Sequence, residues 1–249
     1  MSSRRKNYKA RQTFGFLGLL VVVLAVVLLN PASYETSYVS VENSAESGKA
    51  EPLGAQTSSD TELALNVLET LEVKGRAPKT GYDREQFYKS WPNIDGCSLR
   101  QKIIKRDLGD TAKLSDDNCT VISGEFDEPY TGSHLIFYQK SDLTKGIQID
   151  HVVALSDAWQ KGAQNLSASE RYQLATDPLN LLAVDAKTNQ GKSDGDAATW
   201  LPPNKKFRCT YVARQVSVKS KYHLWVTEAE KTAIKNILKN CPNEPAVGV

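Results

Sequence analysis

The chain has 249 residues, of which 40% are hydrophobic and 24% are charged. This composition is typical of a globular protein, and it excludes wholesale disorder and a collagen-like repeat. The formal net charge is +2, and five of the bases lie in the first 32 residues, which hold no acid. A strongly basic chain that binds nucleic acid through its bulk charge is therefore excluded, so any such function must come from a local site.

The first 32 residues are predicted to be a signal peptide or a signal anchor. Basic residues up to Arg11 precede Phe14–Leu29, sixteen residues without a polar or charged side chain. This run lies between the core of a signal peptide and a membrane span of about 20 residues. A buried core helix is the remaining alternative, but such helices are seldom apolar on every face. Because the bases come first, everything after residue 30 is expected to be exported.

Residues 33–60 are predicted to be a flexible linker. They hold five acids, one base and almost no large apolar side chains. Such a segment cannot bury enough surface to offset the entropy of ordering it. The folded part is then residues 61–249, with 25 bases and 24 acids, a length that suits one domain.

The four cysteines all lie in this exported part, at Cys97, Cys119, Cys209 and Cys241. An even number of cysteines in an oxidising compartment indicates two disulfides, for which three pairings exist. We favour the sequential pairing, Cys97 with Cys119 and Cys209 with Cys241. Each bond would then close a modest loop, contributing about 3–4 kcal/mol in the chain-entropy model. A zinc site is the alternative, but the sequence has no Cys-x-x-Cys pair and no suitably spaced histidine to form one.

The first half of the folded part is predicted to form helices and then strands. Apolar residues at helical spacing predict helices over 61–73, 84–91 and 98–108. Alternating or continuous apolar runs predict strands over 121–126 and 134–139, with a turn between them. A β-branched strand is predicted over 146–155.

The second half continues the mixed pattern, which is typical of an α+β domain. Ser167 and Glu170 form a capping box that opens a helix toward residue 175. A short strand is predicted over 180–184, followed by a helix or turn from residue 187. The predicted closing elements are a hairpin of 212–218 and 222–226 and a helix that begins at a second capping box, Thr227 with Glu230.

The residues able to do chemistry concentrate between positions 150 and 194. Asp150 and His151 lie in the strand predicted over 146–155; Asn180 opens the next strand, and Asn189 follows nine residues later. Asp and Asn oxygens are hard ligands suited to Mg²⁺, or to Mn²⁺. A neutral histidine can accept a proton from an attacking water. An Asp-His pair alone more often ends a strand, but the two asparagines at this spacing favour a one-metal phosphodiesterase.

This segment resembles the HNH, or ββα-metal, nuclease motif. IDHVVAL followed by NLLAVDAKTNQGKSD is similar in order and spacing to the HNH domain of RNA-guided CRISPR nucleases. The chain also resembles an exported HNH endonuclease family, akin to the C-terminal domain of GmrSD-type restriction enzymes. The blocks that carry this resemblance, which covers about residues 73–241, include VKGRAPKTGYDREQF, GCSLRQKIIKRDL, EPYTG, DHVVALSDAWQKGA and WLPPNKKFRCTYVARQVSVK.

The resemblance implies a role for each motif residue. His151 would be the general base, and Asp150 and Asn189 would be the metal ligands. Asn180 would brace the loop and orient His151. An asparagine rather than a histidine at the third motif position implies Mg²⁺ instead of tight zinc or nickel binding.

Further side chains have both a functional and a structural interpretation. Lys192 is a candidate contact to the scissile phosphate, with a solvated lysine as the alternative. Arg100 is a candidate second phosphate contact, with a structural ion pair as the alternative. Four residues are expected to be structural or exposed and not part of the site: Trp159, Trp200, His134 and His223.

The resulting prediction is a single α+β domain built around an HNH motif, which hydrolyses nucleic-acid phosphodiesters outside the cytoplasm. DNA is favoured over RNA, no sequence specificity is expected, and no protein partner is implied. A membrane would be contacted only through the first 32 residues, if they are not cleaved. Two alternatives stay open: an inactive nucleic-acid-binding module of the same fold, and a toxin nuclease delivered to competitors.

Overall fold

The computed structural model describes residues 62–247. They all belong to one compact unit of the chain. The predicted signal segment and linker, residues 1–32 and 33–60, lie outside the described residues. Within the described part, no helix is both long enough and apolar enough to span a membrane.

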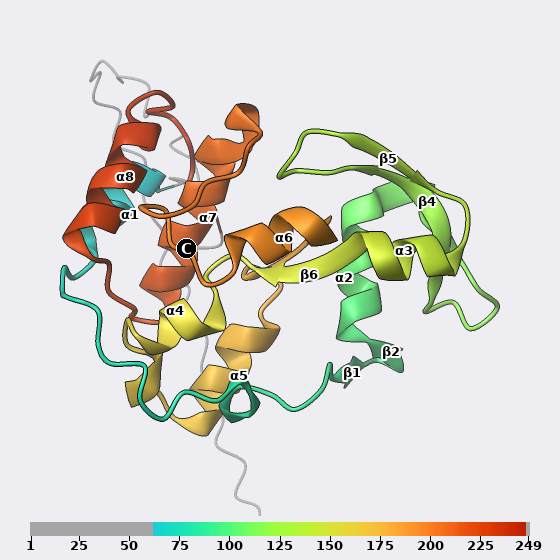
Figure 1. The fold of residues 1–249 in the computed structure, drawn as a ribbon, viewed down its shortest axis with the longest axis horizontal. Helices are drawn as coiled ribbons and strands as arrows, with labels where there is room; N and C mark the ends of the chain where they lie inside the picture. The colour runs from blue at the N-terminus through green and yellow to red at the C-terminus, as the bar shows by residue number, and fades with distance from the viewer. Residues whose placement is uncertain (1–61, 248–249) are drawn as a thin grey trace, which may run out of the picture. The chain divides into compact units, whose positions relative to one another are not determined.

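The described residues mix helices and strands, which confirms the predicted α+β class (Figure 1). The α-helices are α1 (Ala64–Thr70), α2 (Leu99–Leu108), α3 (Lys140–Gly146), α4 (Leu155–Trp159), α5 (Ala168–Thr176), α6 (Ala186–Lys192), α7 (Arg208–Lys221) and α8 (Glu228–Leu238). Four single-turn 3₁₀ helices are η1 (Arg84–Gln86), η2 (Gly109–Thr111), η3 (Ala163–Asn165) and η4 (Lys205–Phe207). The strands are β1 (Asn93–Ile94), β2 (Cys97–Ser98), β3 (Lys113–Leu114), β4 (Val121–Asp127), β5 (His134–Phe137), β6 (Ile147–His151) and β7 (Leu181–Asp185).

The strands pair into three small antiparallel sheets, β1–β2, β3–β4–β5 and β6–β7. In the last pair, Ile147 lies opposite Asp185 and His151 lies opposite Leu181. Helix α6 follows β7 directly and packs on both strands. The two strands and the helix therefore form a ββα unit, with α6 lying beside β6 in the middle of Figure 1.

Both faces of the two-stranded β6–β7 sheet are covered by other elements. Apolar residues of one face join a core cluster with α2, β4 and α3; they are Ile147, Ile149, Leu181 and Ala183. Leu182 and Val184 join the cluster of α1, α7 and α8, which Figure 1 shows together on the other side of this sheet. A one-residue slip of either strand would exchange the faces, so this double burial fixes the register.

The predicted hairpin of residues 212–218 and 222–226 is wrong, because α7 runs through Arg208–Lys221. Val212, Val216 and Val218 are all fully buried against the neighbouring elements. Their β-branched side chains favour a strand only weakly, and the burial of α7 against two core clusters outweighs this preference.

Two other predicted elements are longer than the observed ones. The strand predicted over 146–155 ends at His151, and α4 begins at Leu155. The helix predicted over 84–91 is reduced to the single turn of η1. After both β6 and η1 the chain continues without regular secondary structure close to the candidate motif. Consecutive residues there can point toward different parts of the protein.

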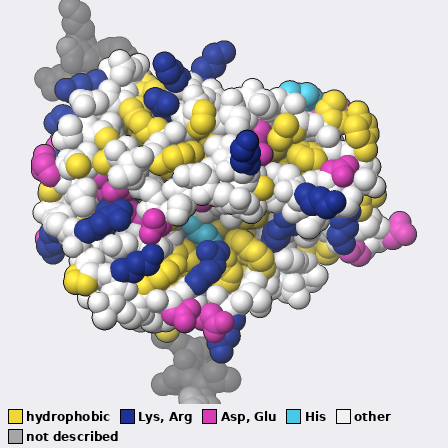
Figure 2. All heavy atoms as spheres, in the orientation of Figure 1, with side chains coloured by type: hydrophobic (Ala, Val, Ile, Leu, Met, Phe, Trp, Pro, Cys, Tyr) yellow, Lys and Arg dark blue, Asp and Glu magenta, His cyan; other side chains and the backbone are white. Residues whose placement is uncertain are grey.

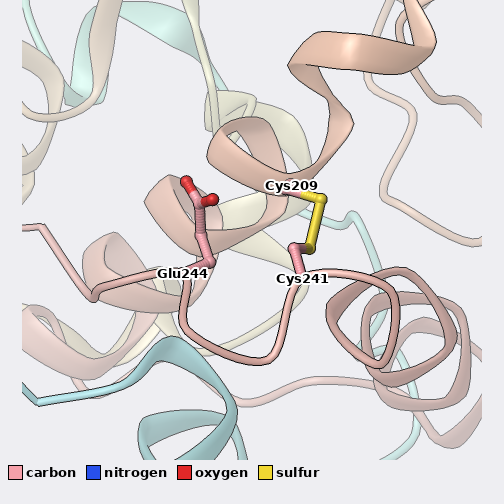
Figure 3. A group of neighbouring side chains, drawn as sticks. All are labelled: Cys209, Cys241 and Glu244. Carbon is pink, nitrogen blue, oxygen red and sulfur yellow. A yellow bond between two sulfur atoms is a disulfide. The ribbon is translucent and has the colours of Figure 1, made fainter.

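Both disulfides form with the predicted pairing, Cys97–Cys119 and Cys209–Cys241. The second bond ties the start of α7 to the segment after α8. Glu244 lies close to its sulfur atoms, as Figure 3 shows. Because both sulfurs are used in the disulfide, this cluster has no thiolate to offer a metal ion.

Buried charges join α4, α7 and α8. The Lys161 ammonium lies 2.7 Å from the carboxylates of Asp196 and Glu230 and 2.8 Å from that of Asp157. The Lys219 ammonium lies 3.0 Å from Glu230. Since the side chains of both lysines and of Glu230 are 0% exposed, each charge depends on these partners for its stabilisation.

The two predicted capping boxes have different outcomes. At Ser167 the box is complete, because the Ser167 hydroxyl and the Glu170 carboxylate each accept from the other's backbone N–H. At Thr227 only half of it forms, with the hydroxyl accepting from the N–H of Glu230. The Glu230 carboxylate accepts from Lys161 and forms an ion pair with Lys219 instead of bonding the helix start.

Candidate active site

A pocket of about 540 Å³ opens against the ββα unit. Three of the four predicted motif residues line it, Asp150 and His151 at the end of β6 and Asn189 on α6. The pocket also takes in Gln148 of β6 and Arg84 of η1. On the face of the molecule shown in Figure 2, a histidine side chain lies near the middle, with Lys or Arg side chains around it.

His151 is held as a neutral imidazole. It is 4% exposed, and its Nε2 lies 2.9 Å from the carbonyl oxygen of Ala175. A carbonyl only accepts hydrogen bonds, so Nε2 carries the hydrogen and Nδ1 keeps a lone pair. Burial lowers the pKa of His151 to about 3, and the positive charge of Arg84 adds to this shift. At neutral pH the ring is therefore uncharged, and the lone pair of Nδ1 is not protonated.

Two aromatic rings fix the plane of the imidazole. The ring of Trp91 lies nearly parallel to that of His151, at 8° and with centroids 6.1 Å apart. The ring of Tyr88 lies 5.9 Å from His151 by the same measure. Both come from the segment before α2, so residues far from the motif in the sequence complete the surroundings of His151.

Asn180 is fully buried and binds the loop that follows His151. Its Oδ1 accepts from the N–H of Val153 at 2.9 Å, and its Nδ2 donates to the carbonyl oxygens of Val153 and Leu174. Leu174 precedes Ala175, whose carbonyl accepts from His151. Asn180 thus ties together the two segments that set the position of the imidazole.

Asp150 is 5% exposed and has a partner on each carboxylate oxygen. The Lys192 ammonium donates to Oδ1 at 2.9 Å, and the Tyr130 hydroxyl donates to Oδ2 at 2.5 Å. Burial raises the pKa of Asp150, while Lys192 and Tyr130 act in the opposite direction. Each carboxylate oxygen can accept a second interaction, so these bonds leave Asp150 able to bind a cation.

The burial of Lys192 does not fit the predicted contact to a substrate phosphate. This residue is 2% exposed, and its ammonium donates to Asp150 and to the backbone oxygen of His151. Both acceptors belong to β6, the strand that carries Asp150 and His151. The structure therefore gives Lys192 a positioning role beneath the carboxylate.

Asn189 faces the same pocket from α6. Its Nδ2 donates to Gln148 Oε1 at 2.9 Å, which orients the amide and leaves Oδ1 as an acceptor. Asp150 and Asn189 together offer hard oxygen donors in one pocket. This donor set fits Mg²⁺ or Mn²⁺, which keep several water ligands.

Arg100 lines the pocket at the start of β6. Its guanidinium donates to the carbonyl oxygen of Ile147 at 3.1 Å, and burial lowers its pKa. Within residues 62–247 no carboxylate lies within 4.0 Å of it, so the structural ion pair given as the alternative for Arg100 is not found there.

The other tryptophans and histidines lie away from the pocket. Trp159 is buried in the core, as predicted, and Trp200 is half-buried against the rings of Tyr130 and Tyr211. His134 and His223 are both exposed.

Arg84, Trp91 and Gln148 are among the pocket residues that were not predicted from the sequence. The block VKGRAPKTGYDREQF contains Arg84 and was the available signal for it. Gln148 lies two residues before Asp150, hence on the same face of the strand, and that alternation could have found it. No sequence signal pointed to Trp91.

Two antiparallel strands followed by a helix, with an Asp-His pair ending the first strand and an asparagine on the helix, define the ββα-metal, or HNH-type, class of domain. The family model described as "GmrSD restriction endonucleases, C-terminal domain" matches residues 99–237. The chain belongs to this family, whose description indicates a nuclease-like function.

A fungal relative extends the comparison. The chain is 38% identical over 181 residues to a protein of Arthroderma benhamiae named "Uncharacterized secreted protein", covering 72% of this chain and 84% of the relative. No solved structure matches. The name of the relative and the two disulfides agree with a location outside the cytoplasm.

Proposed function

We propose that this protein is an extracytoplasmic, divalent-metal-dependent nuclease that hydrolyses phosphodiester bonds, with DNA favoured over RNA. The observation that carries the proposal is the contact between His151 Nε2 and the carbonyl oxygen of Ala175. The Nε2–H is committed to Ala175, so Nδ1 is the free base in a pocket shared with Asp150 and Asn189. A neutral base beside two hard oxygen ligands suits the attack of water on a phosphodiester.

His151 acts on the attacking water. Its Nδ1 takes a proton as the water oxygen forms a bond to phosphorus and the bond from phosphorus to the 3′-oxygen breaks. The departing 3′-oxygen takes a proton from solvent, and the other product carries a 5′-phosphate. Asn180 keeps the imidazole in place during this transfer, because it fixes the loop after β6 to the end of α5.

Asp150 and Asn189 would hold the metal ion. When bound there, the ion supplies positive charge to the scissile phosphate and to the departing oxygen. Tyr130 and Lys192 hold the Asp150 carboxylate in a fixed orientation from the protein side. With two protein ligands, the affinity for Mg²⁺ is expected to be weak and to require millimolar supply.

The substrate is expected to bind with little sequence preference. The folded part is nearly neutral, so few phosphate contacts are available and binding depends on salt. Arg100 is one such contact, because its half-buried guanidinium bonds only a backbone carbonyl and would gain from an anion.

A plasmid-degradation assay with the purified protein tests the proposal. Mg²⁺, Mn²⁺, Ca²⁺ and EDTA are compared in parallel, with the variant His151→Ala as the matched control. Cleavage is expected with Mg²⁺ or Mn²⁺ and is lost with EDTA. Full activity after exhaustive EDTA treatment would contradict the one-metal mechanism. Binding without cleavage under every metal would favour the inactive module.

A further inference from the structure

The pocket has a guanidinium at each end of β6. Arg100 lies at the first residue of the strand, where it donates to the carbonyl oxygen of Ile147. Arg84 lies at the other end, because it donates to the hydroxyl of Tyr88, whose ring packs 5.9 Å from the ring of His151. Both arginines line the pocket that holds the motif residues.

Neither arginine is neutralised within the protein. In the described part of the chain, no carboxylate lies within 4.0 Å of either guanidinium, and their side-chain bonds go to a phenol and a carbonyl. Arg84 is also placed over the ring of Tyr88, 5.3 Å from its centroid. The position of Arg84 is thus set without an acid, which leaves its charge available to an anion.

The distance between the two ends of β6 is long enough to span more than one phosphate of a nucleic-acid strand. At about 3.3 Å per residue, β6 is roughly 13 Å long from Ile147 to His151. One strand of a duplex presents a phosphate about every 3.4 Å along its axis. A strand lying along β6 would therefore place its scissile phosphate near Asp150 and Asn189 and still reach both arginines.

We propose that Arg84 and Arg100 bind phosphates on opposite sides of the scissile phosphate, so that the nucleic-acid strand runs along β6. This inference rests on the proposed nuclease function and specifies its substrate as a strand with phosphates on both sides of the cut. Arg84 lies outside the family match at residues 99–237, so the segment before α2 supplies this half of the substrate contact.

The first test measures phosphate contacts without hydrolysis. Binding of a fluorescent single-stranded oligonucleotide is followed by anisotropy in EDTA over a range of salt concentrations. For single strands, each phosphate contact contributes about 0.7 to the slope of log affinity against log salt. Arg84→Ala and Arg100→Ala should each lower the slope by about this amount. Lys239→Ala, which removes an exposed charge beyond α8, should leave it unchanged. An unchanged slope in either arginine variant overturns the proposal.

The second test assigns each arginine to a side. The substrates carry a central phosphodiester whose neighbouring linkages are made uncharged, as methylphosphonates, on the 5′ side or on the 3′ side. In the unmodified protein, either change should lower kcat/KM at the central bond by about 10- to 100-fold, the scale of one charged hydrogen bond. Arg84→Ala should become insensitive to the change on one side, and Arg100→Ala to the change on the other.

The outcomes separate this inference from the proposed function. If both variants become insensitive to the same side, the path along β6 is wrong although the nuclease stands. If the binding slopes change as expected but no metal supports cleavage, the two phosphate contacts stand and the hydrolysis proposal fails.

Discussion

His151 donates its Nε2 hydrogen to the backbone carbonyl of Ala175, 2.9 Å away at the end of α5. The bond selects one of the two neutral tautomers, in which the other ring nitrogen keeps its lone pair. A backbone carbonyl does not take up a proton at neutral pH, so in the proposed reaction the imidazole would be the group of this pair that changes protonation.

Replacing His151 by alanine should therefore remove the proton acceptor and leave both metal ligands. Cleavage at saturating metal is expected to fall by about 10²–10⁴, the usual scale of general-base catalysis. The affinities for Mg²⁺ and for nucleic acid should hardly change, which calorimetry and anisotropy can measure. Rescue of His151→Ala by added Mg²⁺ would show that His151 is a ligand and that the assigned role is wrong.

Asn189→Ala should impair cleavage through metal binding and not through the rate at saturating metal. The substitution deletes a metal ligand, so the Mg²⁺ concentration for half-maximal cleavage should rise, while the rate recovers in part at high metal. Direct titration of Mg²⁺ by calorimetry gives a readout that does not depend on activity. Lys187→Ala, an exposed change on the same helix, is the control and should bind metal normally. Equal metal affinity in both variants would remove Asn189 from the ligand set.

The pKa of His151 also predicts how stability depends on pH. Its value is lowered to about 3 in the folded protein by burial, against about 6.5 in an unfolded chain. Between these values the unfolded chain binds more protons, so the free energy of unfolding falls as pH drops from about 6.5 toward 3. Urea unfolding at pH 7.5 and 4.5 in EDTA should show a larger loss for the unmodified protein than for His151→Leu. Equal losses would contradict a buried neutral imidazole.

The motif was predictable because its residues are close in sequence and their order follows the ββα connection. Asp150 and His151 end one strand, and Asn189 lies on the helix that follows the next. The side chains around them were not predictable in the same way. Tyr130 and Trp91 come from distant segments, and only the folded chain places them against Asp150 and His151.

Burial of charge was the other feature that sequence patterns missed. Lys192 and Glu230 lie in helices whose neighbouring residues are polar, a pattern that indicates solvated or capping side chains. Their partners are far away in the sequence: Lys192 pairs with Asp150, and Glu230 pairs with Lys161, 69 residues before it. Local patterns carry no information about such pairs, because long-range packing alone decides whether a lysine finds a buried carboxylate.

The buried charges of α4, α7 and α8 give the last prediction. Glu230→Gln keeps the shape of the side chain but removes the charge that faces Lys161 and Lys219. Removing one partner of a buried ion pair typically lowers the free energy of unfolding by about 3–5 kcal/mol, because the remaining charge is left uncompensated. Thermal or urea unfolding should show a loss of this size. Glu228→Gln, exposed in the first turn of the same helix, should cost far less. Equal effects of the two substitutions would show that the network contributes nothing specific to stability.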